Sequence, residues 1–231
     1  MNSHFQFCMA TLLARDLVRT FRKHSPDLNA HVLPEHFATM YRPGVQLHNV
    51  AFDTIRHRKL HVETERIGMV QAVHSSLYPR PQYDAPILTM DIVTIGDAVT
   101  HAFLDACPST SNLVLPREYD DAFQDIQTQY GLTSTKRHLL PDYGRSIFSR
   151  RCYVGKGIDP VMFTRFAIDC VAMHVEYVKQ LDVSRDHREN RNNQQRYSRQ
   201  QRQNPKKREL IAGALGGDME LTEKYLAMIF D

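Results

Sequence analysis

The strongest constraint on the fold lies between residues 57 and 107, where apolar and polar side chains alternate with a period of two. Alternation of this kind places successive side chains on opposite faces of a β-strand. Turn residues interrupt the pattern at Gly68, across residues 79–86, and at Gly96-Asp97. The segments between them are residues 58–66, 69–78, 87–95 and 98–107. The middle of the chain therefore predicts a meander of four strands.

Helical patterns flank this meander on both sides. Apolar residues spaced by three or four predict helices over residues 6–23, 117–129, 160–181 and 219–230. Residues 152–154 could add a strand, whereas residues 26–56 contain three prolines and no clear period, and we expect them to be irregular. Strands in the middle with helices at both ends predict one α+β domain over residues 1–231, with a mostly antiparallel sheet covered by helices.

Several classes of protein are disfavoured by what the sequence lacks. No apolar run approaches the roughly 18 residues needed to cross a bilayer, and neither a dinucleotide-binding nor a P-loop motif is present. The four cysteines lie far apart, and the twelve histidines form no familiar metal-binding pattern. We therefore expect a cytoplasmic protein with no bound metal or cofactor. If it is an enzyme, redox equivalents must come from outside the chain.

Ionisable side chains interrupt the predicted strands at positions where apolar residues are usual. Asp91 shares a strand face with Ile87 and Thr89, His74 shares one with Tyr78, and Glu63 and His61 lie two residues apart. If these strands are neighbours, one face of the sheet gathers all of them. Burial would raise the pKa of the Asp91 carboxyl, and such a set suits proton delivery. The alternative is that each is a hydrogen-bonded polar residue at a strand edge.

A basic stretch at residues 191–208 contains seven Arg and Lys residues and no acidic residue. Three interpretations are open: a solvated helix, a phosphate-binding face, or a docking face for an acidic partner. A protein that binds RNA through this stretch is a weaker possibility, because Tyr197 is the only aromatic residue in it.

Six segments together resemble the family of ferredoxin-dependent bilin reductases. No single segment is a well-known motif, but the ordered set is specific and covers most of the chain beyond residue 58. The segments are KLHVE (59–63), VHSSLYPRPQYDAPILTMDIV (73–93), FLDACP (103–108), LPDYGRSIFSRRC (140–152), NNQQRYSRQQRQNPKKREL (192–210) and YLAMIFD (225–231).

The resemblance implies a three-layer α/β/α sandwich, with an open-chain biliverdin held between the sheet and the C-terminal helices. It also implies an enzyme without metal or flavin, which takes electrons singly from an external [2Fe–2S] ferredoxin. The protein itself would supply the protons, through radical intermediates of the bilin. We expect a monomer that binds neither nucleic acid nor membrane.

The family's functional residues can be carried over to this chain by position. The proton-donating Asp is similar in position to Asp91, its partner His to His74, and the Glu that serves the D-ring exovinyl group to Glu63. The substrate-binding positions that the resemblance implies are His61, Lys206, Arg137, Asn204 and Thr100. His138 could replace Arg137, Pro205 follows Asn204, and the spacing from Glu63 to His74 is one residue shorter than in cyanobacterial members.

The function expected from this resemblance is reduction of biliverdin IXα to phycocyanobilin by two successive two-electron steps. Phycoerythrobilin or a dihydrobiliverdin is the alternative product, and a bilin- or haem-binding carrier without turnover is the alternative of another class. Ferredoxins are acidic, so we expect docking on a basic surface. The candidate docking residues are Arg56, Arg58, Arg196, Arg199, Arg202, Lys207 and Arg208.

Overall fold

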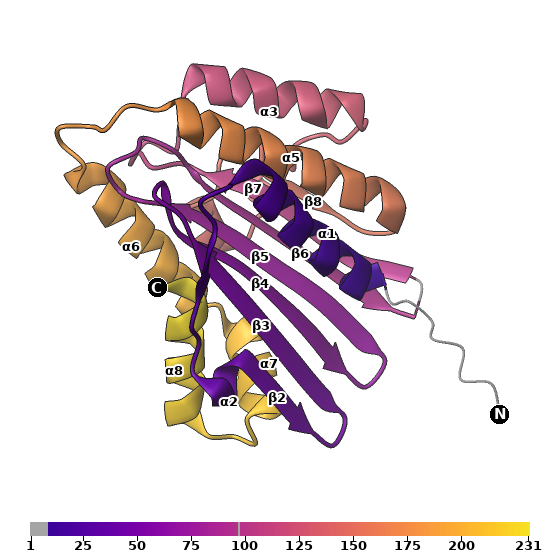
Figure 1. Ribbon diagram of the computed structural model, residues 1–231. Coiled ribbons are helices and arrows are strands. Elements are labelled where there is room, and N and C mark those ends of the chain that lie inside the picture. The colour runs from indigo at the N-terminus through magenta and orange to yellow at the C-terminus, as the bar shows by residue number, and fades with distance from the viewer. Residues whose placement is uncertain (1–8, 97) are drawn as a thin grey trace.

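One antiparallel sheet organises the chain (Figure 1). The computed structural model describes residues 9–96 and 98–231. Within them, the strands pair in the order β1-β3-β4-β5-β6-β7-β8, and β2 pairs with β3 as well. Every pair is antiparallel. The strands are β1 (Asn29–His31), β2 (Thr39–Arg42), β3 (Val45–Asp53), β4 (His57–Ile67), β5 (Val70–Pro79), β6 (Ile87–Ile95), β7 (Ala98–Cys107) and β8 (Tyr153–Gly155).

The predicted meander is confirmed as β4 to β7, which follow one another in both the chain and the sheet. Their bounds differ from the predicted ones by one residue at most. Gly96 has a φ of 57°, a left-handed conformation that glycine adopts readily. Ile95 pairs with Ala98 across this hairpin, while Asp97 lies outside the described residues.

The prediction for residues 26–56 was wrong, because they contain three strands and the short helix α2 (Glu35–Ala38) rather than irregular structure. Both faces of β3 are covered, so Leu47 and Phe52 are buried on opposite sides and the strand shows no simple alternation. Pro43 and Gly44, with Gly44 at a φ of 76°, form the turn between β2 and β3. That Pro-Gly pair was the available signal for a hairpin.

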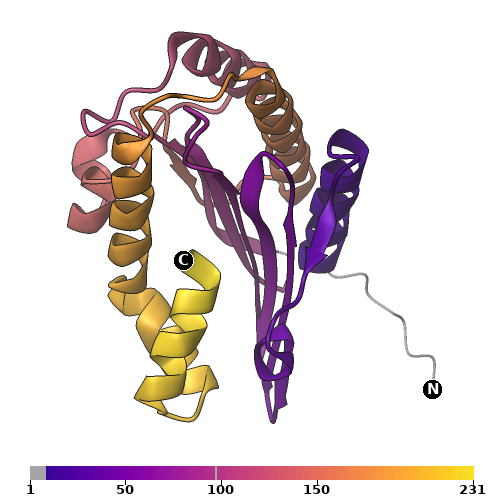
Figure 2. The same cartoon turned by 60° about the vertical axis from the view of Figure 1, so that its left-hand side comes forward.

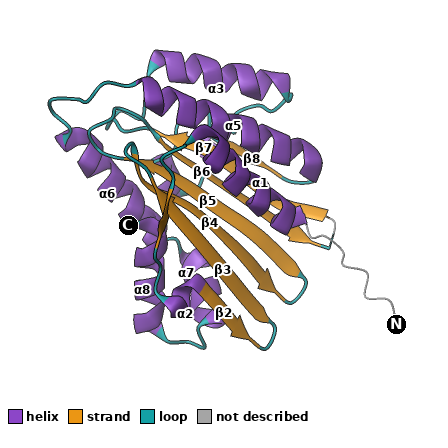
Figure 3. Cartoon of the chain, in the orientation of Figure 1, coloured by secondary structure: helices purple, strands orange, loops and turns teal. Residues whose placement is uncertain are grey.

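Helices cover both faces of the sheet, as Figures 2 and 3 show. The first face carries α1 and α5, with α3 packed on α5, and the second carries α6, α7 and α8. No helix in the described part of the chain is long and apolar enough to span a membrane. The helices are α1 (Met9–His24), α3 (Arg117–Gln129), the 3-10 helix η1 (Arg137–Leu139), α4 (Asp142–Arg145), α5 (Pro160–Gln180), α6 (Arg188–Arg202), α7 (Pro205–Ala214) and α8 (Met219–Phe230).

Helix α6, which carries much of the basic stretch, packs through polar side chains as well as through the buried Tyr197. Asn190 donates hydrogen bonds to the carbonyls of Pro81 and Tyr83, and Gln194 donates to the carbonyl of Pro79 at 2.8 Å. These carbonyls lie at the end of β5 and in the proline-rich turn after it, where amide donors are suitable partners for them. Packing against the residue 79–83 turn therefore accounts for Asn190 and Gln194.

A buried carboxyl on β7 makes the stability of this fold depend on pH. Asp105 accepts hydrogen bonds from the Ser149 hydroxyl at 2.6 Å and the Ser149 backbone N–H at 3.0 Å. Burial raises the pKa of Asp105 from 3.8 to about 6 despite these bonds. Between those values the unfolded chain loses its proton while the folded chain keeps it, so the contribution of Asp105 to stability falls as the pH rises.

We expect the unfolding free energy of the unmutated protein to fall by about 3 kcal/mol relative to Asp105→Asn between pH 3 and pH 7, since each pKa unit corresponds to about 1.4 kcal/mol. Urea unfolding of both proteins across that range measures the difference. A difference that does not change with pH would show that Asp105 keeps its ordinary pKa.

Candidate active site

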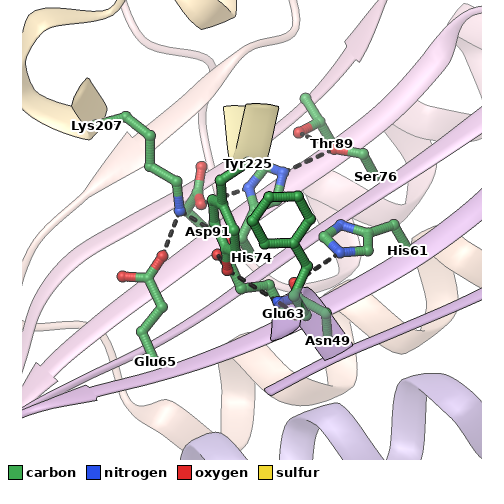
Figure 4. A network of polar contacts seen from close by, with 11 residues as sticks. Asn49, His61, Glu63, Glu65, His74, Ser76, Thr89, Asp91, Lys207 and Tyr225 are labelled. Atoms are coloured by element: carbon green, nitrogen blue, oxygen red, sulfur yellow. Dashed lines mark hydrogen bonds and ion pairs between the residues drawn. The ribbon is translucent and has the colours of Figure 1, made fainter. Parts of the chain in front are cut away.

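Polar side chains form a row across the sheet face that α6, α7 and α8 cover. Pairing between strands places Asn49 opposite Glu63, Glu63 opposite His74, and His74 opposite Asp91. Directly paired residues of antiparallel strands point to the same face. The structure thus brings together the three residues that the sequence singled out, as Figure 4 shows. Their chemical roles remain predictions.

The Asp91 carboxylate and the His74 imidazole are directly hydrogen-bonded. His74 Nδ1 donates to Asp91 Oδ1 at 2.7 Å, and the other ring nitrogen, Nε2, lies 3.0 Å from the hydroxyl of Ser76. Ser76 in turn lies 3.2 Å from the Thr89 hydroxyl. Because hydroxyl groups can donate or accept, this chain of hydrogen bonds fits either protonation state of His74. Sequence reasoning placed Thr89 on the face of Asp91 but assigned no role to it or to Ser76, although each lies two residues from a member of the row.

The pKa of Asp91 is shifted opposite to the sequence expectation. Desolvation alone would raise it, but the adjacent His74, through charge and hydrogen bond, outweighs desolvation and lowers the pKa of the carboxyl. The Asp91 side chain also keeps 38% of its surface exposed, whereas His74 keeps 6%. In this structure the carboxylate is therefore ionised, and a proton donor at this position must be the Asp91–His74 pair rather than an isolated acid.

Glu63 is fully buried beneath two residues of the C-terminal helices. The Tyr225 hydroxyl on α8 donates to Glu63 Oε1 at 2.6 Å, and the Lys207 ammonium on α7 donates to Oε2 at 2.7 Å. Burial would raise the pKa of Glu63, but the Lys207 charge is the main opposing influence and the pKa is lowered. Glu63 is thus a carboxylate with both oxygens occupied.

His61 belongs to the same hydrogen-bond network through Asn49. Its Nε2–H donates to Asn49 Oδ1 at 2.9 Å, and Asn49 Nδ2 donates to the Tyr225 hydroxyl at 2.9 Å. Complete burial lowers the pKa of His61 to about 3, so the ring is neutral. His61 therefore acts here as a neutral neighbour of Glu63 and not as an acid.

Glu65 and Lys207 are site residues that sequence reasoning did not assign. Glu65 follows Glu63 by two positions on β4 and so shares its face, and Lys207 bridges the two carboxyl groups. The prediction that Lys207 docks ferredoxin was wrong, because its ammonium is turned inward onto these acids. The strand period could have identified Glu65. Lys207 lies far away in sequence, so only the tertiary structure reveals it.

The predicted substrate-binding residues lie in different parts of the structure. Asn204 precedes α7, accepts from the Lys206 N–H and donates to the Tyr143 hydroxyl at 3.0 Å, while the Lys206 side chain is exposed. Thr100 donates to the Val93 carbonyl at a bulge near one end of β7 and is not hydrogen-bonded to the described network. Arg137 begins η1, and its side chain lies outside the described part of the chain.

Hydrogen bonds hold the last turn of α8 over the site. The Phe230 ring lies 5.6 Å from the His74 ring, edge to face. Lys59 donates to the carbonyls of Met228 and Ile229 at 3.0 and 2.8 Å, and Ser198 donates to that of Phe230 at 2.5 Å. These donors satisfy carbonyls that a helix end leaves without partners. The helix end is thereby held against the sheet.

The site combines two ionisable centres on neighbouring strands, Asp91–His74 and Glu63, with apolar cover from Phe230 and Phe103. Such a face suits protonation of a flat, apolar molecule at two separate points. The described residues contain no cluster of three His, Cys, Asp or Glu side chains arranged to hold a metal ion.

The chain is similar to known proteins over nearly all of its length. The family profile described as "Ferredoxin-dependent bilin reductase" matches residues 16–231. A relative from Gloeobacter violaceus named phycocyanobilin:ferredoxin oxidoreductase is 30% identical over 75% of this chain and 69% of its own length. A relative of the same name from Trichodesmium erythraeum is 29% identical, over 80% and 76% of the two chains.

A solved structure shares the fold. The crystal structure of tomato phytochromobilin synthase in complex with biliverdin superposes with a TM-score of 0.75. The match covers 95% of this chain and 83% of the tomato chain at 15% sequence identity. This likeness confirms the predicted α+β fold, with its antiparallel sheet between layers of helices.

Proposed function

The chain belongs to the ferredoxin-dependent bilin reductases, oxidoreductases whose electron donor is ferredoxin, and from this premise we propose that it reduces biliverdin IXα to phycocyanobilin. The observation that carries the proposal is the row of Glu63, His74 and Asp91 on one covered face of the sheet. A bilin has two carboxylates and a long apolar body, so it needs a flat apolar slot and separate proton donors.

Each reduced double bond takes up two electrons and two protons. In the proposed reaction the electrons arrive one at a time from a [2Fe–2S] ferredoxin, so the bilin passes through radical states. Asp91–His74 delivers protons at the centre of the tetrapyrrole, and Glu63 delivers one to the D-ring exovinyl group. Reduction of the D-ring precedes reduction of the A-ring.

Biliverdin would lie between the site face and helices α6 to α8. In this structure Phe230, Tyr225 and Lys207 occupy positions directly above the row. Binding therefore requires these side chains to withdraw from Glu63 and His74. Lys206, with Arg137 or His138, is the proposed cation for the propionates, and Asn204 positions Lys206 at the start of α7.

The proposal is tested by an anaerobic assay with biliverdin IXα, ferredoxin and ferredoxin reductase, with the products separated chromatographically. We expect phycocyanobilin to form, and biliverdin to persist when ferredoxin is omitted. Formation of phycoerythrobilin or a dihydrobiliverdin would support the reaction class but contradict the proposed product. Tight biliverdin binding without any reduction would identify a carrier.

We propose that ferredoxin docks beside the exposed arginines of α6. Arg199 is exposed, whereas other candidates are engaged within the chain: Arg58 with Gln194, Arg202 with Asp231, and Arg208 with Glu223. Opposite charge speeds association, and salt screens it with a Debye length of about 8 Å at physiological ionic strength.

Raising salt from low to physiological strength should therefore slow ferredoxin-dependent turnover several-fold while leaving the dissociation constant of biliverdin nearly unchanged. Arg199→Gln should reduce the salt sensitivity of turnover. Equal salt effects on turnover and on biliverdin binding would show that the basic residues act on the bilin instead.

A further inference from the structure

Two buried carboxyl groups share one ammonium group on the site face. Glu63 and Glu65 lie on the same face of β4, with side chains that are 0% and 4% exposed. The Lys207 ammonium contacts Oε2 of Glu63 at 2.7 Å and Oε1 of Glu65. The start of α7 fixes this position, because Asn204 caps the helix and Pro205 is its first residue.

The cluster is one positive charge short of neutrality if both carboxyl groups are ionised. The other groups that face it do not supply this charge: Tyr225 from α8 and Asn49 from β3 are neutral, and burial keeps His61 of β4 uncharged. His74 of β5 is hydrogen-bonded to the Asp91 carboxylate of β6, so that pair adds no net positive charge. An uncompensated buried charge is costly, and retaining one proton removes it.

The proton belongs on Glu65 rather than Glu63. Tyr225 and Lys207 both donate to Glu63, which stabilises its ionised form. Burial is the main influence that raises the pKa of Glu65, and the neighbouring Glu63 charge raises it further, although Lys207 opposes the shift. Both carboxyl groups contact the same Lys207 ammonium, which places them close enough to exchange a proton once the contacts of Glu63 are released.

We propose that Glu65 and Lys207 are positioning residues that control when Glu63 can donate a proton to the bilin. In the substrate-free protein Lys207 holds Glu63 as a carboxylate and Glu65 stores the proton. When the bilin displaces Tyr225, the proton moves from Glu65 to Glu63, and Lys207 remains with the newly ionised Glu65. The net charge is unchanged, and the inference rests on the proposed role of Glu63 in vinyl reduction.

The first test uses no substrate. Carbon-13 NMR titration of glutamate-labelled protein should show one carboxyl with a pKa well above the ordinary range, and this signal should be lost in Glu65→Gln. In Lys207→Met the pKa of Glu63 should rise, because the ammonium that lowers it is gone. If Glu65 titrates at its ordinary value in the unmutated protein, the inference is overturned.

The second test measures the pH profile of vinyl reduction with biliverdin and reduced ferredoxin. In Glu65→Gln, Lys207 pairs with Glu63 alone, so vinyl reduction at neutral pH should fall at least about tenfold and its profile should move to lower pH. In Lys207→Met, Glu63 stays protonated to higher pH, and the profile should move up by about one unit or more. A role in folding alone would not shift the two profiles in opposite directions.

Lys224→Met is the matched control, because Lys224 forms an exposed pair with Glu220 on α8. Its profile should equal that of the unmutated protein. Thermal unfolding of each variant checks the fold, and Glu65→Asp, which restores a carboxyl, should partly recover vinyl reduction. Profiles that stay in place in both variants would overturn the inference. Absence of any bilin reduction by the unmutated protein would instead overturn the proposed function, while the titration still decides where the proton lies.

Discussion

Asp91→Asn is expected to lower bilin reduction by about 10²- to 10⁴-fold while biliverdin still binds, the range typical for loss of a proton-transferring group. The amide oxygen of Asn can still accept from His74 Nδ1, so the His74 ring should keep its position. An amide cannot carry the negative charge that pairs with a protonated imidazole, nor accept and return a proton. The first electron should then reach the bilin without the proton that must accompany it.

The measurement combines a biliverdin titration by absorbance with anaerobic turnover by reduced ferredoxin. We expect an unchanged dissociation constant and a long-lived radical signal in electron paramagnetic resonance. Asp121→Asn is a suitable control, since Asp121 is 65% exposed on α3, across the sheet from the site. Normal turnover by Asp91→Asn would remove Asp91 from the mechanism.

Glu63→Gln is expected to leave the D-ring vinyl group intact. A vinyl group has no basic atom of its own, so its reduction needs an acid held against it. The introduced amide has nearly the same volume as the carboxyl and can still accept from Tyr225, but it carries no transferable proton and no charge for Lys207. We expect phycocyanobilin formation to fall about 10²-fold or more.

Chromatography with mass spectrometry distinguishes the products, because each reduction adds two hydrogen atoms. Glu220→Gln, at an exposed position of α8, serves as the control. Phycocyanobilin formed at the normal rate by Glu63→Gln would show that another group protonates the vinyl. Phycoerythrobilin formed by the unmutated protein would show that the orientation of the bilin, and not Glu63, determines the product.

The sequence predicted the central part of this site because strand alternation is a local property. Glu63, His74 and Asp91 could be assigned to faces from their neighbours alone, and short turns made their strands adjacent. Residues 26–56 could not be predicted in this way, since β3 is covered on both faces. Asn49, which lies on β3, was therefore missed.

The contacts that set the charge of the site come from helices distant in sequence. Tyr225 and Lys207 lie more than 140 residues from Glu63 along the chain. Without them, burial is the only visible influence on the acids, and burial predicts raised pKa values. The predicted direction of the pKa shift at Asp91 was wrong for a related reason. The adjacent His74, through its charge and its direct hydrogen bond, outweighs desolvation.

The alignment of the acids across the sheet originates in the turn that joins β4 to β5. Ile67 pairs with Val70 around Gly68 and Met69, and this register carries along both strands until Glu63 meets His74. An added residue in that turn must be absorbed as a bulge, or the pairing slides and the alternation carries His74 to the opposite face. Segment exchange between homologues should therefore transfer the β4–β5 hairpin as a whole, with crossover points in the loops outside it, so that the turn length and the acids it aligns are inherited together.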